Sequence, residues 1–272
     1  MAKLDIEQYR VRPGKAFELE RIDPGVANAF RDEREAYEAA RDAALTELRE
    51  LHERLYAEGE QALLIVMLAI DTGGKDSTID RIFSGLNPQG CVVSSFGVPT
   101  EEERAHDFLW RIHRRMPRKG QIGIFNRSHY EDVTVQRVHE WIDKPIWERR
   151  YEHILDFESL LVESGTSVVK FHLRISKEEQ AQRLKERLDD PTKHWKFNPD
   201  DLAERKRWDD YQEAFEDAIV ATSTDDAPWY VVPANSKWYR DAVVARAVVE
   251  QMRKLAPQYP SPVEGIERYT VE

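Results

Sequence analysis

Short apolar runs alternate with amphipathic stretches along most of the chain. The runs predicted as strands are 61–70 (QALLIVMLAI), 91–96 (CVVSSF), 121–126 (QIGIFN), 167–175 (SVVKFHLRI) and 228–234 (PWYVVPA). Each run is far shorter than the roughly 18 to 20 apolar residues that span a bilayer, so we expect no membrane association. Strands that are apolar almost throughout are typical of a parallel sheet covered by helices on both faces.

Helical patterns fill the intervals between these strands. Before the first strand, residues 24–58 are rich in Ala, Leu, Glu and Arg, with apolar positions about 3.6 residues apart, which predicts one long amphipathic helix. Further helices are predicted at 75–86, 101–116, 146–164, 177–190, 201–219 and 238–255. The alternation predicts a three-layer α/β fold with a parallel sheet of about five strands.

Amino-acid composition limits the classes of ligand and indicates the cellular compartment. The chain has 51 acidic and 40 basic residues and a net charge of −11, which argues against general nucleic-acid binding. The N-terminal residues lack the apolar core of a signal peptide, and the one cysteine, Cys91, allows no intrachain disulfide. We therefore expect a cytoplasmic protein, and we expect Cys91 to be a buried small side chain at the start of an apolar strand.

Two basic stretches stand out against this acidic background. One runs from Arg111 to Lys119 and the other from Arg183 to Arg207. Each can be a solvated helix face, which is the ordinary use of such a run. If both converge on one site, they predict a compact polyanion as the ligand.

A glycine-containing loop, DTGGKDST, follows the first predicted strand directly. Gly73 and Gly74 allow backbone N–H groups to turn toward an anion, the next helix offers its positive N-terminal end, and Lys75 adds a mobile charge. In a parallel sheet the first strand-to-helix turn is a preferred phosphate site. The alternative is a tight turn without a ligand, because glycine serves turns generally.

The loop departs from the usual G-x-x-x-x-G-K-[ST] pattern at two positions. Ala69 replaces the first glycine, and Asp76 stands where a magnesium-binding Ser or Thr is expected. Asp71 and Asp76 would repel a phosphate unless a hard cation neutralised them, which predicts Mg²⁺ held jointly by carboxylate and substrate oxygens. Helix capping is the alternative role, especially for Asp76.

A second polar motif, FNRSHYEDV, follows the third predicted strand. Asn126 ends the strand, Arg127 has the geometry for bidentate phosphate contact, and Glu131 and Asp132 lie one turn later, where nucleoside-triphosphate enzymes often hold a metal. Alternatively, Arg127 pairs with a nearby carboxylate and the two acids belong to a helix N-terminus. His129 is expected to be a packed residue without a catalytic role.

A third motif, RLKERLDDPTKHWKFNPDDL, lies between the fourth strand and a later helix. Arg183 and Arg187 are four residues apart and share a helix face. Two prolines bracket an irregular insert that holds Lys193 and Lys196. The arrangement fits a lid that closes over phosphates and excludes water, or else a plain surface hairpin of helices.

Taken together and in this order, DTGGKD, FNRSHYED, RLKERLDDPTKHWKFNPDDL and APWYVVPA resemble the polyphosphate kinase 2 family. The pair EEERAHDFLWRIHRRMP and FNRSHYEDV resembles its class III branch. The resemblance implies a single P-loop kinase-like domain over 1–272, with an N-terminal extension carrying a long helix at 1–60 and a lid at about 176–205. It also implies reversible, Mg²⁺-dependent transfer of the terminal phosphoryl group of polyphosphate to AMP and ADP.

The resemblance assigns roles to individual residues. The expected catalytic residues are Lys75, Asp71, Arg127, Glu131 and Arg187. The expected phosphate- and nucleotide-binding residues are Gly73, Gly74, Lys75, Asp76, Ser77, Asn126, Arg127, Arg183, Arg187, Lys193 and Lys196. Mg²⁺, with Mn²⁺ as an alternative, is expected at Asp71, Asp76, Glu131 and Asp132. Asn126 and Glu131 resemble the pair that is linked to AMP use in class III.

The expected partners are inorganic polyphosphate, nucleoside mono- and diphosphates, and further copies of the chain in a dimer or tetramer. Two rival functions stay open at this point. One is an ATP-dependent nucleoside monophosphate kinase, which the unusual glycine loop disfavours. The other is a non-catalytic regulator that binds polyphosphate or nucleotide.

Overall fold

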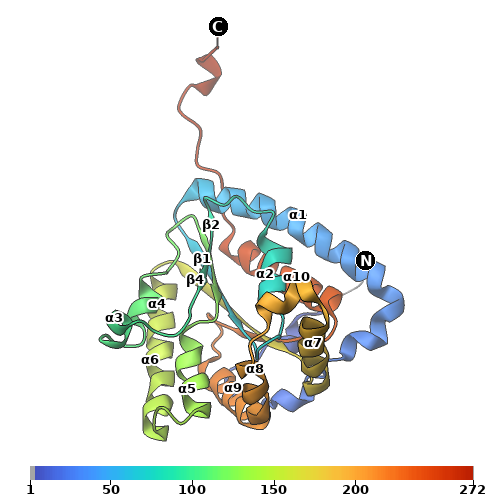
Figure 1. Ribbon diagram of the computed structural model, residues 1–272. Helices are drawn as coiled ribbons and strands as arrows, with labels where there is room; N and C mark the ends of the chain where they lie inside the picture. Colours follow the sequence, from blue (N-terminus) through green and yellow to red (C-terminus); the bar gives the residue numbers. More distant parts are fainter. Residues whose placement is uncertain (1–3, 272) are drawn as a thin grey trace.

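A five-stranded parallel sheet forms the centre of the computed structural model, which describes residues 4–271 (Figure 1). The strands are β1 (Ala62–Leu68), β2 (Cys91–Ser95), β3 (Ile122–Asn126), β4 (Thr166–Arg174) and β5 (Trp229–Pro233). Their order is β2-β3-β1-β4-β5, and each neighbouring pair is parallel. The five predicted strands and their parallel arrangement are confirmed, with β1 in the middle.

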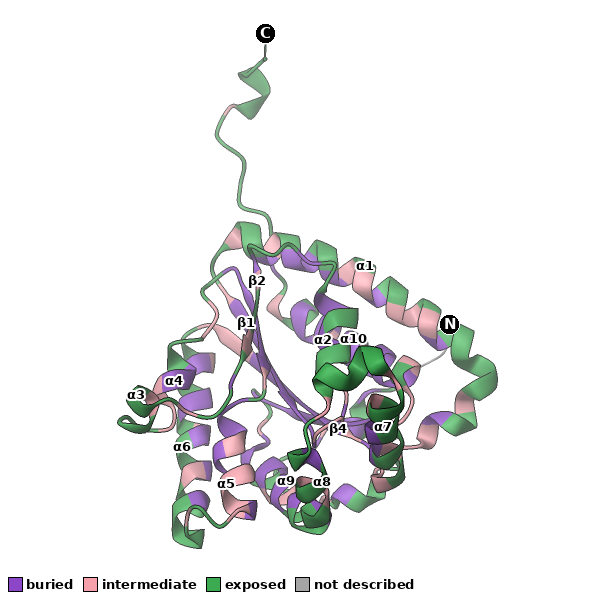
Figure 2. Ribbon diagram, viewed as in Figure 1, coloured by how far each residue is buried: buried purple, intermediate pink, exposed green. Residues whose placement is uncertain are grey.

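Helices cover both faces of this sheet (Figure 1). On one face lie α1 (Arg34–Glu58), α2 (Lys75–Phe83) and α10 (Lys237–Leu255), and on the other lie α4 (Trp110–His113), α5 (Val135–Val138), α6 (Lys144–Glu163) and α9 (Trp208–Thr222). Every residue of β1 is buried between these layers, which explains its unbroken apolar run (Figure 2). None of the helices in residues 4–271 has the length and apolarity needed to cross a membrane.

The predicted helix at 101–116 is wrong, because two short helices take its place. α3 (Glu101–Arg104) begins at Thr100, whose side chain and that of Glu103 form a reciprocal capping box. The chain then turns, with the Asp107 carboxylate accepting a hydrogen bond from the Leu109 backbone N–H at 3.0 Å before α4 begins. Asp is a poor helix-interior residue because its side chain competes for nearby N–H groups, and the turn follows from that competition.

Two other predicted helices were too long. The helix expected from residue 24 begins as a 3₁₀ helix, Val26–Glu33, with non-helical backbone at Phe30, and only then continues as α1. The helix expected at 201–219 is divided into α8 (Asp200–Glu204), a 3₁₀ turn at Arg205–Arg207 and α9. The other helices agree with expectation to within a few residues.

The N-terminal segment protects one edge of the sheet. Arg10 forms an antiparallel bridge with Tyr230, and the Val11 N–H donates to the Trp229 carbonyl at 2.9 Å. At the opposite edge, Val92 and Val93 of β2 are 40% and 49% exposed. Cys91 is half-buried rather than fully buried as expected, and its burial raises the pKa of the thiol to about 11.

Candidate active site

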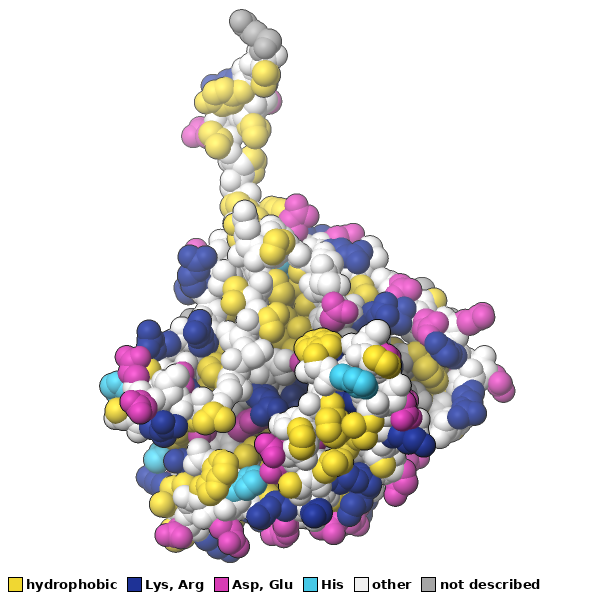
Figure 3. Space-filling view, viewed as in Figure 1, with side chains coloured by type: hydrophobic (Ala, Val, Ile, Leu, Met, Phe, Trp, Pro, Cys, Tyr) yellow, Lys and Arg dark blue, Asp and Glu magenta, His cyan; other side chains and the backbone are white. Residues whose placement is uncertain are grey.

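A cavity of about 680 Å³ lies at the carboxyl ends of β1 and β3. It is covered by α7 (Lys177–Asp189), the 3₁₀ turn Pro191–Lys196 and α8, the segment expected to form the lid. Lys and Arg side chains gather in this hollow (Figure 3). Its lining includes Asp71, Thr72, Gly73, Gly74, Lys75, Asp76, Ser77, Asn126, Arg127, Arg183, Arg187, Lys193 and Lys196. The three predicted motifs therefore meet at one cavity.

The glycine loop that follows β1 has a conformation few sequences can adopt. Thr72 has φ +63° and Gly74 has φ +102°, both in the region that favours glycine. At Gly73, an added Cβ would lie 2.6 Å from the Ala69 Cβ and 2.8 Å from the Ile70 carbonyl oxygen. The Thr72 hydroxyl is buried and has no hydrogen-bond partner within residues 4–271. A buried hydroxyl of this kind fits a loop built to receive an anion oxygen.

Gly74 is also constrained by its neighbours on α7 and α10. A Cβ at this position would lie 2.3 Å from Arg240 Nη1 and 3.4 Å from Arg183 Nη1. Arg240 is almost fully buried, and its Nε and Nη2 groups donate to Asp241 Oδ1 at 2.8 Å and 2.6 Å. Two guanidinium groups thus stand behind the loop and add positive charge to the helix N-terminus.

Lys75 is the first residue of α2 and reaches back over the loop. Its Nζ donates to the Ala69 carbonyl oxygen at 2.8 Å, so the position that departs from the usual glycine supplies a backbone anchor. Burial lowers the pKa of Lys75, while the carboxylates of Asp71 and Glu131 oppose that shift. The ammonium group therefore has acidic neighbours that favour its charged form.

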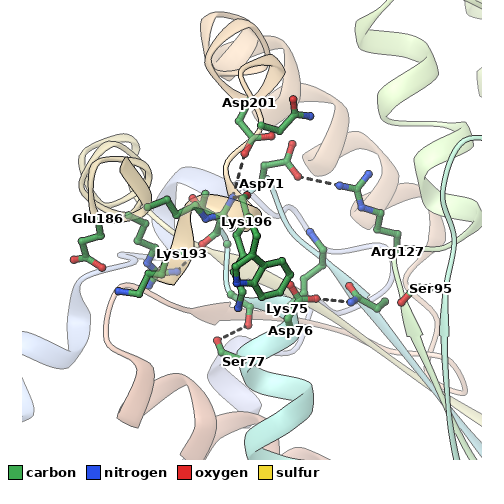
Figure 4. Close-up of a pocket in the computed structure, with 18 of the residues that line it drawn as sticks. Asp71, Lys75, Asp76, Ser77, Ser95, Arg127, Glu186, Lys193, Lys196 and Asp201 are labelled. Carbon is green, nitrogen blue, oxygen red and sulfur yellow. Dashed lines mark hydrogen bonds and ion pairs between the residues drawn. The ribbon is translucent and has the colours of Figure 1, made fainter. Parts of the chain in front are cut away.

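Side chains connect the ends of β1 and β3 (Figure 4). Arg127, in left-handed backbone at φ +64°, donates to Asp71 Oδ1 at 3.1 Å and lies 3.5 Å from Glu131 Oε2. The Glu131 carboxylate is the main cause that raises the pKa of Arg127. Asn126 Nδ2 donates to Asp76 Oδ1 at 2.5 Å. The cross-connections hold the glycine loop and the FNRSHYEDV segment in a fixed relation.

The four expected metal ligands do not form one group. In the described part of the chain, no three His, Cys, Asp or Glu side chains lie close enough to hold a metal ion. Asp71 and Asp76 line the cavity, and the hydrogen bonds given above use only Oδ1 of each carboxylate. These two residues fit a cation that also takes phosphate oxygens and water as ligands.

Asp132, one of the expected metal ligands, does not line the cavity. Its carboxylate is buried away from the cavity, 3.3 Å from Arg111 Nη2, and it also accepts a hydrogen bond from Gln136. Burial raises the pKa of Asp132, and Arg111 works against that rise. Asp132 is therefore used in an internal ion pair.

Glu131 does not line the cavity either, although it stands close behind it. Its side chain is 21% exposed and contacts Arg127, and burial raises its pKa against the opposing charges of Arg127 and Lys75. Glu131 would therefore affect a bound phosphate indirectly, through the position and charge of Arg127 and Lys75.

Arg183, expected to bind phosphate as a lid residue, lines the cavity and is also held by several hydrogen bonds within the protein. Its Nη1 donates to the Thr72 carbonyl at 2.9 Å, its Nη2 to the Ala234 carbonyl at 2.6 Å and its Nε to Glu179 at 2.7 Å. Most of its donors are therefore used to hold the glycine loop against α7 and the β5–α10 connection. Its charge remains beside the cavity.

The other basic lid residues face the cavity with lighter attachments. Arg187 donates to the Lys196 carbonyl at 2.9 Å and to Asp201 Oδ2 at 3.2 Å. Lys193 pairs with Asp190 at 3.1 Å on the exposed surface. An exposed pair such as Lys193–Asp190 is weak, so Lys193 can turn to a phosphate at small cost, whereas Arg187 and Asp201 are less exposed.

The first basic stretch does not take part in the site. No residue from 111 to 119 lines the cavity, and Arg111 is buried against Asp132. Sequence reasoning missed several residues that do line it: Thr72, Ser95, Phe96, Gly97, Glu186, Trp195, Asn198, Asp201 and Lys237. The segment 95–97 could have been found, because it follows the carboxyl end of β2 just as the two motifs follow β1 and β3.

The chain is similar to known proteins in sequence and in structure. The sequence profile of polyphosphate kinase 2 (PPK2) matches residues 31–260. The chain is 51% identical to an AMP/ADP-polyphosphate phosphotransferase of Meiothermus ruber, over 98% of this chain and 100% of the relative, and 40% identical to an ADP-polyphosphate phosphotransferase of Rhodopseudomonas palustris, over 95% and 93%. The crystal structure of polyphosphate kinase 2 from Arthrobacter aurescens is similar with a TM-score of 0.92 at 43% identity, covering 96% of this chain and 93% of that one. The chain belongs to the polyphosphate kinase 2 family.

Proposed function

We propose that the protein is a polyphosphate-dependent nucleotide kinase that transfers the terminal phosphoryl group of inorganic polyphosphate to AMP and ADP. The observation that carries the proposal is the shared cavity, where Lys75, Arg127 and Arg187 converge from three separate segments. A cationic cavity on a protein with net charge −11 favours a compact, strongly anionic substrate. The names of the most similar relatives support polyphosphate as the donor.

The chemistry requires two anions to meet in line. An oxygen of the nucleotide phosphate attacks the terminal phosphorus of polyphosphate, the bond from that phosphorus to the bridging oxygen breaks, and the shortened chain leaves with the electron pair. Little covalent chemistry is left to the protein, so rate enhancement comes from position and charge. Lys75 and the loop N–H groups bind one phosphate, while Arg127 and Arg187 neutralise charge on the transferring group.

Magnesium is part of this proposal. Asp71 and Asp76 would hold the ion together with substrate oxygens, since Mg²⁺ commonly takes one or two carboxylates and keeps several waters. When bound, the ion neutralises phosphate charge and orients the donor. Mn²⁺ favours the same hard oxygen ligands and is expected to substitute.

We propose that both AMP and ADP accept the phosphoryl group. The Meiothermus ruber relative is named for both acceptors, and the Rhodopseudomonas palustris relative for ADP. AMP is one phosphate shorter, so it must sit deeper to reach the same donor. Glu131 lies 3.5 Å from the Arg127 guanidinium, and Arg127 lines the cavity, so we propose that Glu131 affects the choice of acceptor through Arg127.

A matrix of donors and acceptors tests the function. Purified protein with Mg²⁺ receives polyphosphate or ATP, crossed with AMP, ADP, GMP and GDP, and products are separated by ion-exchange chromatography. The proposal predicts ADP and then ATP from AMP and polyphosphate with no ATP added. Product only with ATP as donor would instead identify a nucleoside monophosphate kinase, and binding without turnover would identify a regulator.

We further propose a homo-oligomer that acts in the cytoplasm, where its nucleotide acceptors are found. The segment after α10 projects from the body of the protein, with Val263, Ile266 and Tyr269 more than half exposed (Figure 1). Together with the exposed edge strand β2, this apolar surface favours contact with another copy. Light scattering after size exclusion should give the mass of a dimer or tetramer, and a mass of 31.8 kDa would contradict the proposal.

A further inference from the structure

A buried polar network lies directly behind the FNRSHYEDV segment. His129, Tyr130, Lys170 and Thr222 are 0% exposed and Glu158 is 2% exposed. These residues come from the 3₁₀ turn His129–Asp132 and from β4, α6 and α9, far apart in the sequence. None of them lines the cavity of about 680 Å³.

Tyr130, Glu158, Lys170 and Thr222 form the hydrogen-bonded part of this network, whereas both ring nitrogens of His129 are buried without a hydrogen-bond partner among the described residues. Lys170 Nζ donates to Glu158 Oε2, to the Tyr130 hydroxyl at 3.1 Å and to the Thr222 carbonyl at 2.8 Å, which uses all three of its protons. The Tyr130 hydroxyl donates to Glu158 Oε1 at 2.8 Å. The Thr222 hydroxyl donates to the Ala218 carbonyl at 2.6 Å and accepts from Trp229 Nε1 at 2.9 Å. The Tyr130 hydroxyl therefore lies at the centre of the hydrogen bonds that join Glu158, Lys170 and Thr222.

In a fully buried ion pair such as Lys170–Glu158, the attraction between the charges does little more than offset the cost of removing them from water. Replacing such a pair by apolar residues of similar volume is often neutral or stabilising, so stability alone does not account for it. A network of directional hydrogen bonds also fixes the positions of the groups that it joins. Here the fixed group is Tyr130.

Tyr130 controls the course of the adjacent chain. Its carbonyl accepts hydrogen bonds from the Val133 N–H at 3.2 Å, the Thr134 N–H at 3.0 Å and the Thr134 hydroxyl at 2.8 Å. Its own N–H donates to Ser128 Oγ at 3.2 Å. Between this anchor and β3 lies Arg127 in left-handed backbone, a strained conformation that persists only where the surroundings hold it.

We propose that Tyr130, with its partners Glu158, Lys170 and Thr222, is a positioning residue that holds Arg127 and Glu131 in place at the cavity. This inference rests on the proposed function for its kinetic effect. The network acts through backbone position and touches no substrate. Loss of the hydroxyl alone should therefore loosen the 127–132 segment and slow phosphoryl transfer while the protein stays folded.

Tyr130→Phe tests this with a matched control. The variant keeps the ring, which packs edge-on against Trp229 with ring centroids 4.8 Å apart. The control is Tyr9→Phe, because Tyr9 also has a buried hydroxyl, bonded to the Tyr239 hydroxyl at 2.6 Å and away from the cavity. Both variants lose one buried tyrosine hydroxyl, so a merely structural role would affect them alike.

We expect Tyr130→Phe to lower kcat for polyphosphate-dependent transfer by about tenfold or more, with KM changed by less than about threefold, because a misplaced group costs rate in the transition state. Tyr9→Phe should keep kcat within about twofold of wild type. Equal kcat values for the two variants would overturn the proposal. The double variant Lys170→Met with Glu158→Leu removes the ion pair at similar volume, and full activity in a folded double variant would overturn it as well.

Hydrogen exchange separates this proposal from the proposed function, because it needs no substrate. Amides in peptides covering 127–134 should exchange faster in Tyr130→Phe than in wild type, while those of β1 stay protected in both. Unchanged exchange at 127–134 would overturn the positioning role. Failure of the wild-type protein to turn over polyphosphate would overturn the proposed function and leave the exchange result to decide the positioning role.

Discussion

Replacement of Gly74 by alanine should strongly lower activity at a modest cost in stability. The backbone at Gly74 has φ +102°, and an alanine Cβ would lie 2.3 Å from Arg240 Nη1. Left-handed backbone costs a residue with a Cβ about 1–2 kcal/mol, and the close contact forces the loop or the buried guanidinium to move. A displacement of about 1 Å in a positioning element can lower the rate about 100-fold.

Gly59→Ala is the matched control for backbone strain. Gly59 has φ +68°, and an added Cβ there would have no neighbour within 4 Å. Gly59→Ala should lose about 1–2 kcal/mol of unfolding free energy in urea titrations and Gly74→Ala at least as much, and only Gly74→Ala should lose about 100-fold or more in kcat/KM with polyphosphate and AMP. If Gly74→Ala retained activity within about threefold of Gly59→Ala, the loop would not need its observed shape for catalysis, and the reasoning would be refuted.

Three further outcomes are expected. Glu131→Ala should lower phosphorylation of AMP more than that of ADP, because Glu131 contacts Arg127 and, with Asn126, resembles the pair linked to AMP use; equal losses in kcat/KM would contradict this. His172 is buried, and burial, with smaller contributions from Arg174 and Lys75, lowers its pKa to about 3. Between the pKa of about 6.5 in the unfolded chain and the lower pKa in the folded protein, His172 is protonated only in the unfolded chain. The free energy of unfolding should therefore fall by roughly 2 kcal/mol from pH 6.5 to pH 5. Urea titrations of His172→Gln should show a smaller fall over this range, and an identical fall would contradict the assignment. Excess EDTA should stop turnover and added Mg²⁺ should restore it, whereas full activity in EDTA would remove the metal from the proposal.

Much of the fold could be predicted because the central strands of the sheet are buried on both faces. β1 is wholly buried, so its sequence has no polar interruption, and the strand ends fell where polar motifs begin. The helix break at Asp107 could not be predicted by periodicity, since Ala105, Phe108 and Ile112 keep the helical spacing across the turn. There, capping and turn hydrogen bonds outweigh the helical pattern.

The site could be predicted where one local motif carries the chemistry, as at Gly73, Gly74 and Lys75. It could not be predicted where function depends on which of two partners a side chain meets. Arg183 and Asp132 have the right residue types, but Arg183 bonds backbone carbonyls and Asp132 pairs with Arg111. Those partners come from segments that are distant in the sequence, so they cannot be predicted from the spacing of residues within one motif.

The central claim is that polyphosphate and nucleotide react at the cavity around Lys75. The most direct test measures ADP formed from AMP, polyphosphate and Mg²⁺ without ATP, by wild type, Lys75→Ala and Lys119→Ala, the last removing an exposed lysine that does not line the cavity. We predict that wild type and Lys119→Ala form ADP at similar rates and that Lys75→Ala is slower by about 100-fold or more, since one preorganised cation contributes several kcal/mol to the transition state. No ADP from the wild-type protein, or a Lys75→Ala rate within about threefold of wild type, would contradict the claim.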